Sequence, residues 1–128
     1  MFSTDSKNVD LFPVALSSEG KTLAIGAPRA STEWSGHVVV YGWANEDSNW
    51  VQLYEEITGE TSEDSSGHSL ALSSNGKILA VGEPQENDSD GNVPGQVRVF
   101  SLVRLTSTIC CSLLFCYFSY KLLFVGSS

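Results

Sequence analysis

Through the first hundred positions, short hydrophobic runs alternate with polar turns that contain glycine. The runs VALSS (residues 14–18) and KTLAIGAP (residues 21–28) are rich in Val, Leu, Ile and Ala and are bounded by Gly, Ser and Pro. They are too short for ordinary helices, so we expect two strands. The residues between them, Glu19 and Gly20, predict a hairpin turn.

Two later segments extend this pattern. GHVVVYGW (residues 36–43) places β-branched residues in a row and predicts a third strand. WVQLYEEI (residues 50–57) alternates apolar and polar side chains, which predicts a half-exposed outer strand. Its apolar members are Val51, Leu53 and Tyr54, and its polar members are Gln52, Glu55 and Glu56.

The whole unit recurs within the chain. The fifteen residues from Val14 to Pro28 align with those from Leu70 to Pro84, and ten of the fifteen pairs are identical. GQVRVFSL (residues 95–102) then repeats GHVVVYGW, but the offset grows from 56 to 59, so the second loop is three residues longer. Asn75-Gly76 occupies the turn of the second copy, and both residues tolerate positive φ.

Four short strands in each unit predict an all-β fold. We expect two antiparallel four-stranded blades of a partial β-propeller, followed by an atypical hydrophobic C-terminal tail. The inner strands are apolar on both faces, as expected where neighbouring blades cover them. Small residues at equivalent positions are expected to let adjacent sheets approach closely: Ala15, Ala24, Gly26, Ala71, Ala80 and Gly82.

These segments resemble FG-GAP-type repeats, of which the blades of the integrin alpha-chain β-propeller are the best-known members. Gly26-Ala27-Pro28 is the GAP element intact, and Gly82-Glu83-Pro84 is the same element with Glu in place of Ala. The Phe-Gly element is degraded to Phe12-Pro13 and Gly67-His68. The resemblance covers about residues 10–101 and implies a cell-surface or extracellular protein whose partners are other blades and protein or glycan ligands.

This organisation divides the chain into four parts: a lead-in at residues 1–11, a first blade at 12–59, an incomplete second blade at 60–102 and a tail at 103–128. A closed propeller needs about four to eight blades. Two blades leave open edges and an uncovered core face, so we expect the isolated chain to self-associate.

The tail has a different character from the repeats. It contains no acidic residue, holds all three cysteines and is nearly continuously apolar over residues 109–125. It predicts either a membrane helix over residues 105–125, with Lys121 near one end, or a strand pair that replaces the missing outer strand. A third interpretation, which we favour because the repeat stops within a blade, is sequence alien to the fold after a truncated gene model.

The net negative charge of the chain disfavours some classes of binding partner. The formal net charge is −8, and all fifteen acidic residues lie at or before Asp90. A strongly acidic body disfavours nucleic acid, because phosphate binding needs clustered Lys and Arg. The first twelve residues have neither the basic nor the apolar region of a secretory signal peptide, so an extracellular location follows from the resemblance alone.

Calcium is the cofactor that the resemblance suggests, since many blades of that family hold it in an acidic loop between the first two strands. Here the loops at residues 17–20 and 73–76 lack the carboxylates that calcium needs, and we expect no metal there. The longer loop of the second repeat carries a weak calcium candidate, formed by Glu86, Asp88 and Asp90. Asn87 in the same loop begins an N-x-S glycosylation sequon.

Candidate binding residues lie in the loops that do not repeat, residues 29–35 and 85–94: Trp34, Glu33, Asp88 and Asp90. Trp43 and Trp50 are expected to pack within the fold. His37 and His68 occupy different positions of the repeat and are expected at the surface or at an edge.

We find no nucleophile elbow, phosphate loop or dinucleotide fingerprint. The sequence therefore predicts a non-enzymatic module for protein or glycan binding and adhesion. The alternative is an accessory propeller domain of an extracellular enzyme.

Overall fold

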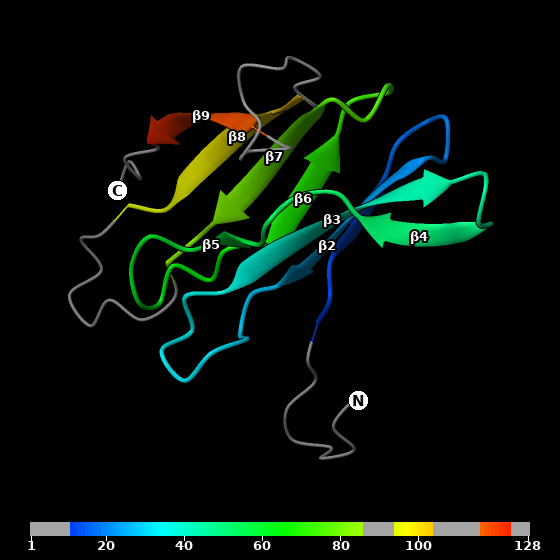
Figure 1. The fold of residues 1–128 in the computed structure, drawn as a ribbon. Coiled ribbons are helices and arrows are strands. Elements are labelled where there is room, and N and C mark those ends of the chain that lie inside the picture. The colour runs from blue at the N-terminus through cyan, green and yellow to red at the C-terminus, as the bar shows by residue number, and fades with distance from the viewer. Residues whose placement is uncertain (1–10, 86–93, 104–115, 124–128) are drawn as a thin grey trace.

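The computed structural model describes residues 11–85, 94–103 and 116–123. These residues contain no helix and form two antiparallel sheets that face each other (Figure 1). The all-β prediction is confirmed at this level.

The first sheet contains the first repeat. Its strands are β1 (Val14–Leu16), β2 (Thr22–Ala27), β3 (His37–Ala44) and β4 (Asn49–Gln52), in the order β1-β2-β3-β4. A fifth strand, β5 (Ile57–Thr58), pairs with the beginning of β3. The first sheet therefore has one strand more than the four that we expect.

The second sheet contains the second repeat and part of the tail. Its strands are β6 (Ser69–Leu72), β7 (Ile78–Glu83), β8 (Gln96–Val103) and β9 (Cys116–Leu123), in the order β6-β7-β8-β9. The two repeats pair in the same register: Ala24 faces Val40 across β2 and β3, and Ala80 faces Val99 across β7 and β8. Equivalent residues therefore take equivalent places in the two sheets.

The expected outer strand of the first repeat is shorter than its alternation indicates. Pairing of β4 with β3 ends at Gln52, and the backbone N–H of Leu53 then donates to Val40 at 2.9 Å. The chain turns inward here because the ring of Tyr54 is buried, with 8% of its surface exposed. Val51, which the alternation places on the apolar side, is 46% exposed.

The tail supplies the fourth strand of the second sheet. Residues 116–123 pair with β8 over its full length, in register from Gln96 opposite Leu123 to Val103 opposite Cys116. This is the strand alternative among our three interpretations, with one strand where we expect a pair. Within the described ranges no helix is long and apolar enough to cross a membrane, and residues 104–115 and 124–128 lie outside those ranges.

Both predicted hairpin turns are present, and glycine alone adopts the left-handed backbone in them. Gly20 has a φ of 68° and Gly76 a φ of 70°, whereas neither Glu19 nor Asn75 has a positive φ. The turn at Asn75 is further held by its side-chain oxygen, which accepts from the backbone N–H of Lys77 at 3.0 Å. The turns are thus fixed by one glycine each, and the Asn-Gly pair does not form a turn with two left-handed residues.

Each sheet has two faces, which we call the front face and the back face. Equivalent positions of the two repeats lie on the face of the same name. The front face carries Leu23, Ile25, Ala27, Val39 and Tyr41 in the first sheet, and Leu79, Val81, Glu83, Arg98 and Phe100 in the second. The back face carries Ala24, Gly26, Val38 and Val40 in the first sheet, and Ala80, Gly82, Val97 and Val99 in the second. These assignments follow from the strand registers and from the alternation of buried and less buried residues along each strand.

The core lies where the back face of the first sheet packs on the front face of the second. Its buried hydrophobic members are Ala24, Val38, Val40, Tyr54, Ile57, Leu79, Val81, Phe100 and Leu102. The small residues of the first repeat allow this packing, since a Cβ added to Gly26 would lie 2.2 Å from the carbonyl oxygen of Gly67. A backbone hydrogen bond from Ser18 to Ser74, at 3.1 Å, joins the two hairpin turns.

Candidate binding surface at the loop end

Three irregular segments lie at one end of the two sheets: residues 28–36, residues 59–68, and residues 84–85 with 94–95. Each adjoins strand ends that the register places side by side, since Ala27 faces His37, His37 faces Thr58, and Glu83 faces Gln96. We call this region the loop end. Residues 86–93, which connect the two parts of the third segment in sequence, lie outside the described residues.

The first two segments are joined by a ladder of backbone hydrogen bonds. Carbonyl oxygens of Glu33, Trp34 and Ser35 accept in turn from Glu63 at 2.8 Å, Ser65 at 3.0 Å and Ser66 at 2.9 Å. Gly36 forms an isolated parallel bridge with Ser66, and a Cβ at Gly36 would lie 2.4 Å from the Ser66 carbonyl oxygen. The second half of the loop, residues 33–36, which includes Trp34, is therefore held by the segment that leads into the second sheet.

Trp34 stands at the surface of this loop in an unusual backbone conformation. Its φ is 53°, in the left-handed region that a bulky side chain rarely adopts, and 41% of its surface is exposed. The guanidinium of Arg29 lies 6.0 Å from the centre of its ring. Left-handed backbone at a non-glycine residue costs about 1–3 kcal/mol and gathers at functional sites.

Other non-glycine residues of the loop end share this conformation. Glu63, Ser65 and Gln85 have φ values of 66°, 51° and 55°. Together with Trp34 they bring four such residues to one end of the molecule. Ser48, with a φ of 47° in the turn between β3 and β4, shares the conformation at the opposite end, so the loop end holds most but not all of these residues among those that the structure describes.

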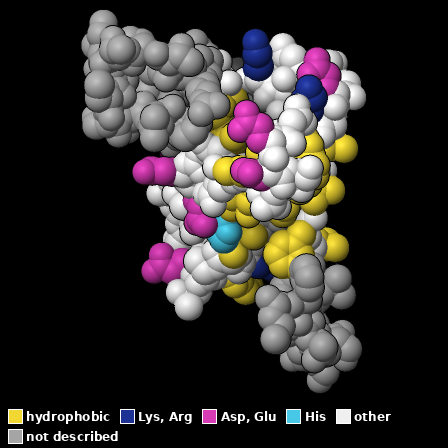
Figure 2. All heavy atoms as spheres, turned by 45° about the vertical axis from the view of Figure 1, so that its right-hand side comes forward, with side chains coloured by type: hydrophobic (Ala, Val, Ile, Leu, Met, Phe, Trp, Pro, Cys, Tyr) yellow, Lys and Arg dark blue, Asp and Glu magenta, His cyan; other side chains and the backbone are white. Residues whose placement is uncertain are grey.

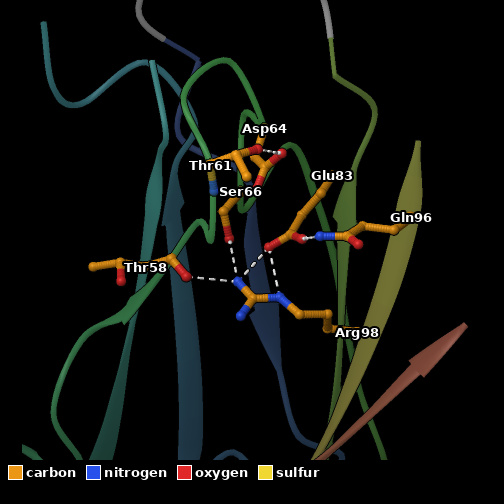
Figure 3. Close-up of polar contacts among 7 residues, drawn as sticks. All are labelled: Thr58, Thr61, Asp64, Ser66, Glu83, Gln96 and Arg98. Atoms are coloured by element: carbon orange, nitrogen blue, oxygen red, sulfur yellow. Dashed lines mark hydrogen bonds and ion pairs between the residues drawn. The ribbon is translucent and has the colours of Figure 1, made fainter. Parts of the chain in front are cut away.

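A buried ion pair lies beneath these loops, between the two sheets (Figure 3). The Nε of Arg98 donates to Oε1 of Glu83 at 2.9 Å, and its Nη2 also contacts that oxygen. The same Nη2 donates to the carbonyl oxygen of Thr58 at 2.7 Å and to Oγ of Ser66 at 3.3 Å. Gln96 donates to the other carboxylate oxygen of Glu83. The pair thus ties the last strand of the first sheet and the 59–68 segment to the second sheet.

We do not predict this ion pair in the sequence analysis, although two differences between the repeats indicate it. Glu83 replaces Ala27 of the first repeat, and Arg98 replaces Val39. Both positions belong to the front face, so opposite charges appear together at neighbouring places that are apolar in the other copy. Two matched charged substitutions on one face of a repeat predict a buried ion pair.

Hydrogen bonds within the 59–68 segment also stabilise its conformation. Asp64, which is 4% exposed, accepts from the backbone N–H of Thr61 at 2.8 Å and from its hydroxyl. Ser65 is buried as well, and within the described part of the chain its hydroxyl has no hydrogen-bond partner. The buried part of the segment, residues 64–67, therefore supports the neighbouring loop, while residues 60–62 and His68 are exposed.

The opposite end of the sheets contains a hollow of about 540 Å³ between the two sheets. Trp43, Leu53, Lys21 and Lys77 are among the residues that line it. The rings of Trp43 and Trp50 pack edge to face with their centres 5.4 Å apart. Trp43 is 37% exposed, so it is less enclosed than the packing within the fold that we expect. This hollow is the second place where a ligand could be held, and the experiments below separate it from the loop end.

The candidate residues of the sequence analysis divide into two groups. Trp34 and Glu33 lie side by side at the loop end, and both are exposed. Glu86, Asn87, Asp88 and Asp90 lie outside the described residues. Over the residues that the structure does describe, no group of three or more His, Cys, Asp or Glu side chains could hold a metal ion.

The repeated motif has a structural position. Gly26 lies at the contact between the sheets, and Pro28 is buried directly after β2. In the second repeat Gly82 lies on the back face and Pro84 is exposed. His37 is half-buried at the beginning of β3, and His68 is exposed before β6.

Comparison with known proteins adds no relative, since no protein-family model and no curated protein matches the chain.

Proposed function

We propose that this chain is a non-enzymatic, protein-binding module of the β-propeller type, and that it binds its partner at the loop end through Trp34. The observation that supports the proposal is the exposure of the Trp34 side chain together with its backbone conformation. A large aromatic side chain is held at the surface by a strained backbone and by a ladder of hydrogen bonds. Strain of this kind is retained where the surrounding structure enforces it for a purpose.

Tryptophan is well suited to such a role. Hot spots of protein interfaces are enriched in Trp, Tyr and Arg, and Trp34 and Arg29 form a pair of these types. Because the loop is already fixed by its bonds to residues 63–66, little conformational freedom remains to be lost on binding.

The charges around Trp34 favour a basic protein surface as the partner. Glu33 and Glu60 are exposed at the loop end, Glu63 is half-exposed, and the whole chain carries a net charge of −8. Complementary potentials steer association and disfavour partners of like charge. A sugar ring is the less suitable ligand, because the side chain of Arg29 lies over the indole on which a sugar would stack.

The propeller type is supported by the way in which the two repeats stack. Equivalent strands pair in the same register, and the back face of one sheet covers the front face of the next. This arrangement can be continued by further sheets in the same sense, as in radial repeats. A cell-surface location and an adhesive role are the expectations that accompany the FG-GAP resemblance, and they belong to this proposal.

The test is binding of the immobilised full chain to an array of peptides graded by net charge, with a glycan array as a second arm. We expect binding to basic peptides that weakens with salt. Trp34→Ala should weaken it by roughly 30-fold or more, the effect of a hot spot worth about 2 kcal/mol. Trp43→Ala is the matched control, since it removes an indole of similar exposure (37%) from the opposite end of β3.

The outcomes separate the candidates. Loss of binding in the Trp43 variant but not in the Trp34 variant would assign the ligand to the hollow between the sheets and contradict the proposal. Binding to glycans alone, or to no peptide of the array, would also contradict it.

A further inference from the structure

Two sheet faces in this molecule are uncovered by any described residue: the front face of the first sheet and the back face of the second. On the first, Val14 is 64% exposed and Leu16 is 57% exposed. On the second, Ile78 is 50% exposed. In Figure 2, in which the right-hand side of Figure 1 comes forward, hydrophobic side chains gather along the right-hand side of the molecule.

Both faces are apolar although the chain is acidic. The front face of the first sheet carries no Lys, Arg, Asp or Glu on β1, β2 or β3, and the back face of the second sheet carries none on β6, β7 or β8. Exposed apolar faces of this kind mark interaction surfaces.

The packing between the two sheets of one chain shows which kind of face covers another. Inside the molecule a back face, that of the first sheet, packs on a front face, that of the second. The same front positions that are half-buried in the first sheet at Leu23 and Ile25 are 0% exposed in the second at Leu79 and Val81. The two uncovered faces are therefore one front face and one back face, which is the combination that already packs within the chain.

The hairpin turns show the same correspondence. A Cβ added to Gly76 would lie 2.3 Å from the hydroxyl of Thr22 on the other sheet, whereas nothing lies within 4 Å of a Cβ added to the equivalent Gly20. The space beside Gly20 is where a neighbouring sheet would place its counterpart of Thr22. On the uncovered back face that counterpart is Ile78.

We propose that a second copy of this chain docks head to tail, with the back face of its second sheet on the front face of the first sheet. The interface repeats the packing between the two sheets of one chain. It is heterologous, because each copy uses two different faces, and such interfaces close into rings or extend into filaments. The inference concerns the sheet faces and goes beyond the binding at the loop end.

The test uses one charge on each face. Leu16→Glu places a carboxylate on the front face of the first sheet, and Ile78→Glu places one on the back face of the second. Both positions are at least half-exposed, so neither change removes a core contact. We expect the wild-type chain to assemble with rising concentration in sedimentation equilibrium, and each variant to remain at the monomer mass of 13.8 kDa.

Mixing the two variants is the decisive step. The Leu16 variant keeps an intact back face and the Ile78 variant keeps an intact front face, so together they should form a one-to-one heterodimer that grows no further. An isologous dimer, in which both copies use the same patch, cannot produce this result.

Val51→Glu is the control for an exposed apolar position outside the two faces. Val51 lines the hollow between the sheets and is 46% exposed, and its change should leave assembly as in the wild type. Circular dichroism and a thermal melt establish that each variant is folded. A wild-type monomer at all concentrations would overturn the proposal. So would folded variants that assemble alone, or that fail to combine when mixed.

Discussion

The buried pair of Glu83 and Arg98 gives the sharpest test of how the loop end is fixed to the sheets. The side chain of Glu83 is 0% exposed and that of Arg98 is 8% exposed, so solvent screens neither charge. Removing one partner leaves the other charge buried without compensation. Such single removals cost about 3–5 kcal/mol.

Glu83→Leu, Arg98→Met and the double variant form a complete cycle. Among the described residues, the guanidinium in Glu83→Leu keeps the Thr58 carbonyl and the Ser66 hydroxyl as acceptors, and the carboxylate in Arg98→Met keeps Gln96 as a donor. We expect each single variant to lose about 3–5 kcal/mol of unfolding free energy. A domain has only about 5–15 kcal/mol in total, so the losses are large.

The double variant should recover most of this loss. Leu and Met are close in volume to the residues that they replace, and a buried ion pair exchanged for apolar residues is often neutral or even stabilising. The Thr58 carbonyl, which is part-buried, then loses its donor, and an unsatisfied acceptor that is fully buried costs about 1–3 kcal/mol, so the cost here lies at the lower end. The net change is therefore expected within about 2 kcal/mol of the wild type.

The assay is urea unfolding followed by circular dichroism. The unfolding free energies are compared only where the wild type and the variants show the same dependence of that free energy on urea concentration. The coupling energy of the cycle should be at least roughly 3 kcal/mol. Single variants that each lose less than about 1 kcal/mol, or a double variant that loses the sum of the two, would refute the reasoning that this pair is buried and mutually dependent.

Two further predictions use pairs of glycines at equivalent repeat positions, and urea unfolding measures both. Gly26→Ala should cost about 1–3 kcal/mol, because the new methyl group meets a backbone carbonyl at the contact between the sheets. Gly82→Ala should cost less, since the nearest atom is a serine hydroxyl that can rotate away, and equal losses would count against the assigned faces. Gly20→Ala and Gly76→Ala both place Ala at a positive φ and should each cost about 1 kcal/mol, with a larger loss at Gly76, where the methyl group also meets Thr22. The reverse order would contradict the contact between the hairpin turns.

Much of the fold follows from the sequence because the repeat supplies two independent copies of one pattern. The hydrophobic runs at residues 14–18 and 21–28, their glycine turns and the third strand are all strands and turns in the structure. The small residues Ala24 and Gly26 lie where the sheets meet, as we expect from their size. The two-residue alternation of a strand and the residue preferences of a turn depend on neighbouring residues only, so they can be predicted from the sequence.

The errors concern features that depend on distant contacts. The alternation from residue 50 onward does not reveal that the ring of Tyr54 is drawn into the core, which ends β4 early and leaves Val51 exposed. A strand pair that replaces the missing outer strand is one of our three interpretations of the tail, and the structure has a single strand there, Cys116–Leu123 beside β8. The apolar pattern of the tail is local, so it does not by itself decide among the three.

For the candidate site, the sequence predicts Trp34 and Glu33 because their loop does not repeat. Both lie exposed at the loop end, and their part in binding stays a prediction. The left-handed backbone of Trp34 could not be predicted, since it is imposed by hydrogen bonds to residues 63–66. The pair of Glu83 and Arg98 was open to prediction from the two matched departures from the repeat.

The most direct test of the stacked arrangement is a set of nuclear Overhauser effects between the sheets, measured in the monomeric Leu16→Glu variant. We expect cross-peaks from the Val38 methyl groups to the Hα atoms of Gly67, and from the Thr22 side chain to the Hα atoms of Gly76. Both pairs join the back face of the first sheet to residues of the second repeat. Strong effects within each sheet, with neither of these cross-peaks, would contradict the packing of one face on the other.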